Sequence, residues 1–115
     1  MIEAVVIDYL NRGSVPAYAE RPEKMPTDPF LLVEKTGSET NDQIYTATIA
    51  VQSWAQTMAD AAELNETVKA QMKGIIALDS ISSCRLQTDY NYTTTALKAY
   101  RYQAVFLITY YEEEI

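Results

Sequence analysis

The stretch QIYTATIAVQSWAQTMADAAELNETVKAQMKGII, residues 43–76, decides the fold of this chain. Its first part alternates, with Tyr45, Ala47, Ile49 and Val51 on one side, which is the period-two pattern of a strand with one buried face. From residue 56 onward, apolar residues recur at spacings of three, four and seven, as they do in an amphipathic helix. The sequence therefore predicts a long strand that runs into a long helix, and this helix covers the sheet. The apolar stripe of the helix should consist of Met58, Ala61, Ala62, Val68, Met72, Ile75 and Ile76.

The N-terminal residues 2–11 predict a first helix. Their apolar side chains lie on one side of a helix, and Gly13 follows as a stop signal. The β-branched run VVI at residues 5–7 keeps a strand as the alternative. The spacing and the stop signal favour the helix.

The segments between this helix and the long strand alternate between extended and irregular structure. Residues 14–20 are short, and Pro16, which has no backbone N–H, favours an edge strand or a strand start. Residues 21–29 contain three prolines and predict a loop. Residues 30–36, FLLVEKT, are typical of a buried strand. Residues 36–42, TGSETND, are polar and predict a connecting loop that is longer than a tight hairpin requires.

Two further strands are predicted near the C-terminus. Residues 81–92 alternate, with Cys84, Leu86, Thr88 and Tyr90 on one face. Residues 99–111 form the longest strand candidate, and apolar residues on both of its faces place it inside the sheet. A turn or wide connection at 93–98 separates the two strands, which should pair antiparallel. The acidic tail, EEEI, is expected to fray.

These elements follow the order α-β-β-β-α-β-β within a single domain, residues 1–115. A helix that follows strands with one buried face must cover that face. The predicted fold class is α+β, with a mostly antiparallel sheet of about four to five strands and two helices packed on one face.

Composition excludes several classes of function. The formal net charge is −7, so a basic face that grips nucleic acid is not expected. The chain contains no histidine, the commonest general base and metal ligand at neutral pH. Its single cysteine, Cys84, allows no intrachain disulfide and is expected to be a small core residue. No apolar run reaches membrane-spanning length and no signal-peptide pattern opens the chain, so we expect an intracellular protein when it is first made.

A search for catalytic residues finds no convincing arrangement. Glu112, Glu113 and Glu114 are adjacent, but they lie on a terminus without rigid support, whereas a catalytic pair must be held in place. Glu39 and Asp42 match no calcium-loop spacing. The three glycines stand apart and form no phosphate loop. We therefore expect no enzyme activity, no cofactor and no metal.

Three segments carry a family resemblance: PFLLVEKTGSETND (29–42), ATIAVQSWAQTMADAAELNETVKAQM (47–72) and LQTDYNYTTTALKAYRYQAVFLITYY (86–111). Together they resemble the small tail-terminator, or tail-completion, proteins of long-tailed bacteriophages and prophages, also known as minor capsid or head–tail joining proteins. The patterns that match are VEKTG, AVQSWA and YRYQAVFLITY, and none of them is a catalytic signature. The resemblance covers nearly the whole chain, although the proline-rich residues 21–29 have no counterpart.

The resemblance implies a virion protein of the tail or neck, made in the bacterial cytoplasm. Such proteins form a ring, commonly a hexamer, that ends polymerisation of the tail tube and docks the tail to the head. The implied partners are further copies of the chain, the tail-tube protein and the head connector or adaptor, with no sequence-specific nucleic acid and no membrane. The acidic balance suits a lumen that does not grip DNA. The candidate assembly contacts are Thr36, Gly37, Ser38, Glu39, Asn41, Asp42, Thr93, Thr94, Thr95, Lys98, Tyr100, Arg101 and Tyr102.

Three alternatives stay open on the sequence. Another neck component, such as a connector adaptor, would share ring assembly but meet a different partner. A monomeric domain that binds a small ligand or peptide would have a closed pocket. A small hydrolase or nuclease is opposed by the absence of histidine and of any metal-ligand cluster in the sequence.

Overall fold

The computed structural model describes residues 1–94 and 99–111 of the chain. Residues 95–98 of the predicted connection and the acidic tail 112–115 lie outside the described residues. The helices are α1 (Ile2–Leu10), α2 (Met58–Lys73) and the 3₁₀ helix η1 (Gly74–Ala77), and the strands are β1 (Ala17–Tyr18), β2 (Phe30–Asn41), β3 (Ile44–Ala55), β4 (Ile81–Asn91) and β5 (Tyr100–Tyr111).

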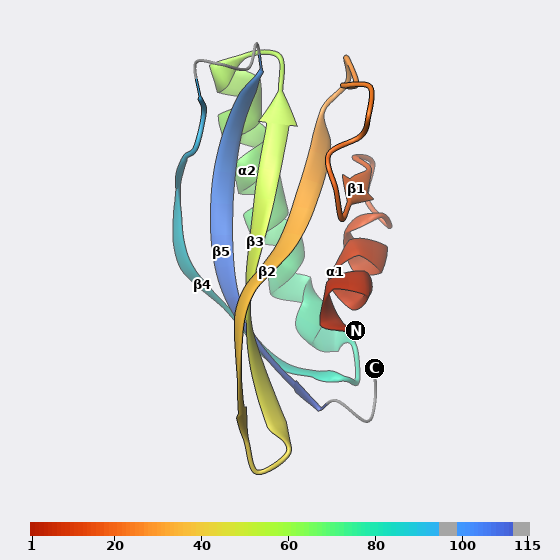
Figure 1. Cartoon of the computed structure of the whole chain (residues 1–115), viewed down its shortest axis with the longest axis vertical. Helices are drawn as coiled ribbons and strands as arrows, with labels where there is room; N and C mark the ends of the chain where they lie inside the picture. Colours follow the sequence, from red (N-terminus) through yellow and green to blue (C-terminus); the bar gives the residue numbers. More distant parts are fainter. Residues whose placement is uncertain (95–98, 112–115) are drawn as a thin grey trace.

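The five strands form one sheet in the order β1-β2-β3-β5-β4. β1 pairs with β2 in parallel, and the other neighbouring strands pair antiparallel. Both α-helices pack on one face of this sheet, and α2 lies along β3 and β5, behind the strands in Figure 1. β1 follows Pro16 and lies at a sheet edge, as the proline predicted. The α+β class and the predicted order of elements are confirmed.

The main core lies between the two helices and the sheet. Val6 of α1 and Val68 of α2 pack there with Ile49 of β3 and Phe106 of β5, and all four are at most 2% exposed. Because β3 and β5 are neighbours, one helix face covers both. This arrangement is the one that the alternation in residues 43–55 predicted.

The predicted apolar stripe of α2 is right in its middle and wrong at its ends. Met58 and Ile76 are 36% and 56% exposed, whereas Leu64 and Asn65 are buried. Ile76 lies in η1, whose three-residue turn rotates the side chains away from the phase set by α2. The positions of the predicted stripe that are fully buried are Ala61, Val68, Met72 and Ile75.

The C-terminal ends of α1 and α2 cap each other. The Tyr9 hydroxyl donates to the carbonyl oxygen of Gln71 at 2.8 Å, and the Gln71 side-chain amide donates to the carbonyl oxygen of Leu10 at 3.3 Å. Each side chain adds a hydrogen bond to the last turn of the partner helix, where intrahelical donors run out. Gly74 leaves room for this contact, because a Cβ there would lie 2.6 Å from the Tyr9 hydroxyl oxygen.

The predicted loop at residues 36–42 is wrong, because β2 continues through it as far as Asn41 and pairs with β3. The turn consists of Asp42 and Gln43 alone, with φ of 50° and 69°. Two positive φ values are what a two-residue hairpin turn needs to match the twist of its strands. The small polar residues favour a loop locally, but pairing with the β-branched residues of β3 extends the strand.

We expect Gln43→Gly to stabilise the protein by about 0.5–1 kcal/mol. Glycine adopts positive φ without the steric strain that a side chain suffers, and the relief exceeds the entropy lost from a more flexible unfolded chain. Urea unfolding followed by circular dichroism measures the difference. Gln43→Ala, which keeps a Cβ, is the matched control; equal stabilisation by both variants would rule out backbone strain as the cause.

The predicted face of β4 is right only in its first half. Cys84 and Leu86 pair with the β5 residues of the helix-facing side. A register shift between Leu86 and Thr88 inserts Gln87 as a bulge. Thr88 and Tyr90 therefore do not share a face with Cys84 and Leu86. They lie on the face of the sheet away from the helices.

Candidate functional site

The candidate assembly contacts lie at opposite ends of the molecule, whose long axis measures 44 Å. β3 runs along this axis and pairs with β5 over its whole length, from Ile44 to Ala55. Residues 36–42 stand at the lower end in Figure 1. Thr95 and Lys98 lie outside the described residues. The candidates at the upper end are Thr93, Thr94, Tyr100, Arg101 and Tyr102.

The lower end is formed by the tip of the β2–β3 hairpin, residues 37–46, which we term the arm (Figure 1). Every residue from 34 to 44 is exposed, including Ile44 at 40%. A register shift at Thr36 marks the base of the arm. β1 pairs only with Leu31 and Leu32, so in the described residues the outer backbone edge of the arm is unpaired. Residues 37–44 of the arm are therefore exposed, and one edge of the arm is open to contact.

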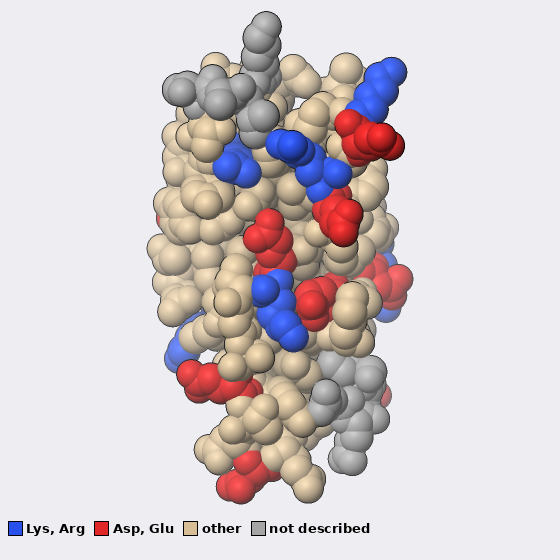
Figure 2. Space-filling view, viewed as in Figure 1, with Lys and Arg blue, Asp and Glu red and all other residues tan. Residues whose placement is uncertain are grey.

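The charge of the arm is acidic. Its ionisable residues are Glu39 and Asp42, and neither forms an ion pair within the described part of the chain. Figure 2 shows acidic side chains at the lower tip of the molecule. The arm thus presents carboxylates beside the apolar side chain of Ile44.

The upper end is organised by Arg101. Its guanidinium carbon lies 4.9 Å from the centre of the Trp54 ring and 4.4 Å from that of Tyr92. Its Nε donates to the Tyr92 carbonyl oxygen at 2.7 Å, and its backbone N–H donates to Thr93 Oγ1 at 3.0 Å. Arg101 therefore holds Tyr92 and Thr93 against the sheet, and its guanidinium is occupied within the chain.

A buried polar network continues from Arg101 across the face opposite the helices. Trp54 Nε1 donates to Gln52 Oε1 at 3.1 Å, and Gln52 Nε2 donates to Gln103 Oε1 at 2.9 Å. Gln103 Nε2 then donates to the Tyr90 hydroxyl at 2.6 Å. Gln52 and Gln103 are 4% and 8% exposed. Sequence reasoning missed this network, although two glutamines in otherwise apolar strands were its signal.

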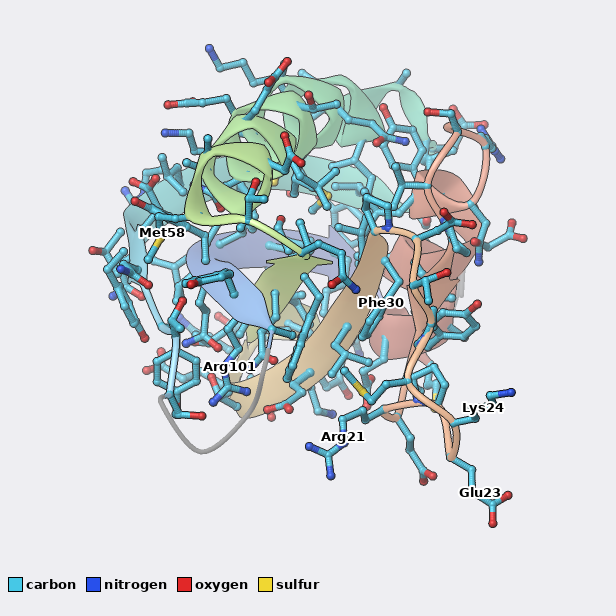
Figure 3. The ribbon with its side chains drawn as sticks, turned by 90° about the horizontal axis from the view of Figure 1, so that it is seen from above. Arg21, Glu23, Lys24, Phe30, Met58 and Arg101 are labelled. Atoms are coloured by element: carbon cyan, nitrogen blue, oxygen red, sulfur yellow. The ribbon has the colours of Figure 1, made fainter. Side chains whose placement is uncertain are left out.

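The proline-rich loop, residues 21–29, covers one end of this face. Phe30 stacks on Trp54 with ring centres 5.4 Å apart, and Met25 and Pro26 close over the pair. Gln56 Nε2 donates to the Thr27 carbonyl oxygen at 3.2 Å and ties the loop to the end of β3. Figure 3 shows Arg21, Glu23 and Lys24 of the loop pointing away from the sheet. The loop thus completes a second, smaller core.

The outer side of α2 carries a charged cluster beside β4. Lys69 Nζ lies 2.9 Å from a Glu66 carboxylate oxygen and 3.0 Å from Asp89 Oδ2. The hydrogen bonds to Glu66 and Asp89 raise the pKa of Lys69. The buried side chain of Asn65 donates to the same Asp89 oxygen at 2.8 Å. These charges satisfy one another and fix α2 to β4, so they are structural.

Cys84 is expected to react slowly with iodoacetamide, about 100-fold slower at pH 8 than an ordinary thiol. Burial raises the pKa of its thiol from 9.0 to about 11, which lowers the reactive thiolate fraction. The matched control is Cys84→Ser with Ser83→Cys, which moves the thiol to an exposed neighbouring position. Equal rates for the two thiols would contradict the burial argument. The ratio of rates should shrink as the pH rises toward 11.

Within residues 1–94 and 99–111, no group of three His, Cys, Asp or Glu residues is placed to hold a metal ion. No helix in the same residues has the length and apolar character needed to cross a membrane. No protein-family model matches the sequence, and a search of curated proteins finds no similar sequence.

Proposed function

We propose that this chain is a non-enzymatic structural protein of a long-tailed phage or prophage. In this proposal it assembles as a ring of six copies at the head-proximal end of the tail tube. The ring ends polymerisation of the tube and docks the tail to the head connector. The resemblance of the three quoted segments to tail-terminator proteins is the sequence support for this function.

The observation that carries the proposal is the difference between the two ends of the molecule. One end is an exposed acidic arm, and the other carries Arg101 packed on the rings of Trp54 and Tyr92. A subunit that joins a tube to a connector needs two different contact surfaces on opposite sides. Because β3 and β5 link the ends along 44 Å, one rigid sheet fixes their relative position.

The charge supports the same function. A net charge of −7 opposes tight binding of DNA, which carries a dense negative charge. Heterologous contacts between identical subunits generate a closed ring when the rotation closes. A ring of acidic subunits would surround DNA without holding it.

Light scattering over a concentration series, with and without the purified tail-tube protein of the same phage, tests the proposal. We expect either six times the chain mass of 13.0 kDa, or a monomer that joins only tube ends. Electron microscopy of the mixture should place the protein at one end of each tube. A monomer that is indifferent to tubes would overturn the proposal and favour a ligand-binding domain. Binding to the connector but not to tube ends would favour the connector-adaptor alternative.

A further inference from the structure

An apolar groove lies between α2 and the segment that joins α1 to β1. Its volume is about 550 Å³, and its floor is formed by Val15, Leu31, Leu64 and Val68. Arg12 is the one charged residue among those that line it. The groove lies on the helix-bearing side of the sheet, because Leu64 and Val68 belong to α2.

Arg12 places a positive charge beside this groove. Its guanidinium carbon lies 5.7 Å from the centre of the Tyr9 ring, and within the described residues it forms no ion pair. Arg12 is exposed, so an incoming carboxylate can reach it. The groove therefore suits an occupant that combines an apolar side chain with a neighbouring acidic group.

The arm has this chemistry. Ile44 is 40% exposed, and Asp42 lies beside it in the turn, with Glu39 on the opposite strand of the arm. The two carboxylates, like Arg12, have no ion-pair partner among residues 1–94 and 99–111. The arm and the groove thus carry opposite charges that are available for ion pairing with each other.

The arm cannot enter the groove of its own chain. Leu31 in the groove floor and Gly37 at the base of the arm lie six positions apart on the same strand, β2. A strand rises by about 3.3 Å per residue, so the base of the arm is about 20 Å from Leu31 and the tip extends further away. An arm that fills the groove must come from a second copy.

We propose that the arm of one copy docks in the groove of a neighbouring copy. Ile44 packs on the apolar floor, and Glu39 and Asp42 lie beside Arg12. The contact is heterologous, because it joins two different surfaces of identical chains, and it leaves a free arm at one end of the assembly and a free groove at the other. It rests on the proposed function, since it names the contact that links successive subunits of the ring.

Charge reversal tests this contact. Arg12→Glu disables the groove, and Glu39→Lys with Asp42→Asn disables the arm; all three positions are exposed, and asparagine tolerates the positive φ of Asp42. We expect each variant to weaken association by about tenfold or more. Combining Arg12→Glu with Glu39→Lys and Asp42→Asn in one chain should restore association, because a reversed arm then meets a reversed groove. No recovery in the combined variant would overturn the charge pairing.

Mixing the two defective proteins gives a sharper result. Here the arm-defective chain carries the neutral substitutions Glu39→Gln and Asp42→Asn, because a reversed arm would be attracted to the reversed groove of Arg12→Glu. The neutral-arm chain keeps its groove and Arg12→Glu keeps its arm, so the mixture should form dimers and stop there. Analytical ultracentrifugation separates such dimers from rings. Larger assemblies in the mixture, or no dimer at all, would contradict a single arm-in-groove contact.

Disulfide trapping provides a readout that does not depend on tail tubes. In a Cys84→Ser background, Asn41→Cys in one protein and Ser14→Cys in the other should form a mixed dimer on oxidation. Asp60→Cys, also exposed but on the first turn of α2 and outside the groove lining, is the matched control for Ser14→Cys. Equal yields for Ser14→Cys and Asp60→Cys would overturn the proposal.

These outcomes separate the two proposals. Trapped dimers from a protein that ignores tail tubes would support the arm contact and reject the tail-terminator function. Rings on tube ends that survive both charge variants would support that function and reject the arm contact.

Discussion

Trp54→Ala is expected to lower the free energy of unfolding by about 3–5 kcal/mol. The Trp54 side chain is 1% exposed, stacks on Phe30 and lies under the guanidinium of Arg101. Its removal leaves a cavity in the second core and deprives Gln52 of a hydrogen-bond donor. Guanidinium unfolding followed by far-ultraviolet circular dichroism measures the loss, because tryptophan fluorescence disappears with the side chain.

Two control variants identify the cause of this loss. Trp54→Phe keeps an aromatic ring on Phe30 but lacks the Nε1 donor, so about 1–2 kcal/mol is expected. Tyr100→Ala removes an aromatic ring that is 39% exposed at the same end of the sheet, and should change stability by less than about 1 kcal/mol. If Trp54→Ala were no more harmful than Tyr100→Ala, the second core would contribute little to stability.

Asn65→Asp is the second substitution with a large expected effect, a loss of roughly 3 kcal/mol at pH 7. Asn65 is 2% exposed, and its Nδ2 lies 2.8 Å from Asp89 Oδ2. The substitution keeps the shape but replaces this donor with a carboxylate oxygen beside another carboxylate. Lys69 contacts Asp89 and offsets only part of the repulsion. Urea unfolding at several pH values measures the difference from the unaltered protein.

The pH dependence distinguishes repulsion from misfolding. The new carboxyl group should have a pKa above its ordinary value, because burial and the charge of Asp89 favour its neutral form. Its folded-state pKa exceeds its unfolded-state pKa, so the penalty is absent at low pH and grows as the pH rises between them. The deficit should therefore shrink as the pH falls toward about 4, the ordinary pKa of aspartic acid, and should be smallest below it. Asn65→Ala is the control, and a pH-independent deficit in Asn65→Asp would contradict the charge argument.

The parts of the fold that could be predicted from the sequence are those in which local pattern and tertiary burial agree. Ala47, Ile49 and Val51 alternate and are all buried against the helices. The C-terminal strand was expected inside the sheet because both faces are apolar, and β5 lies between β3 and β4. In these segments the same pattern of apolar residues predicts both the strand and the side chains that are buried.

The predictions that differ from the structure have physical causes that a single sequence does not display. The bulge at Gln87 changes the side of every later residue of β4, and nothing in the letters around it marks an insertion. The extension of β2 to Asn41 depends on pairing with β3, which supplies the hydrogen bonds that a polar segment lacks by itself. The groove beside Arg12 depends on the spacing of two helices, which periodicity does not determine.

The sequence predicted the surroundings of the candidate contacts only in part, for a similar reason. Polarity singled out residues 36–42, and the structure places them on an exposed hairpin instead of a loop. Arg101 and its neighbours were also candidate contacts, but the guanidinium packs on Trp54 and Tyr92 of the same chain. Exposure depends on which strands are neighbours, and the order β3-β5-β4 follows from the whole chain.

That strand order has a consequence for biosynthesis. β5 lies between β3 and β4, yet the ribosome makes it after both of them. Until β5 emerges, β4 has no strand to pair with, and one edge of β3 is exposed to other nascent chains. The sheet therefore cannot grow strand by strand during translation, and its completion waits for a late insertion step with large sequence separation, which slows folding.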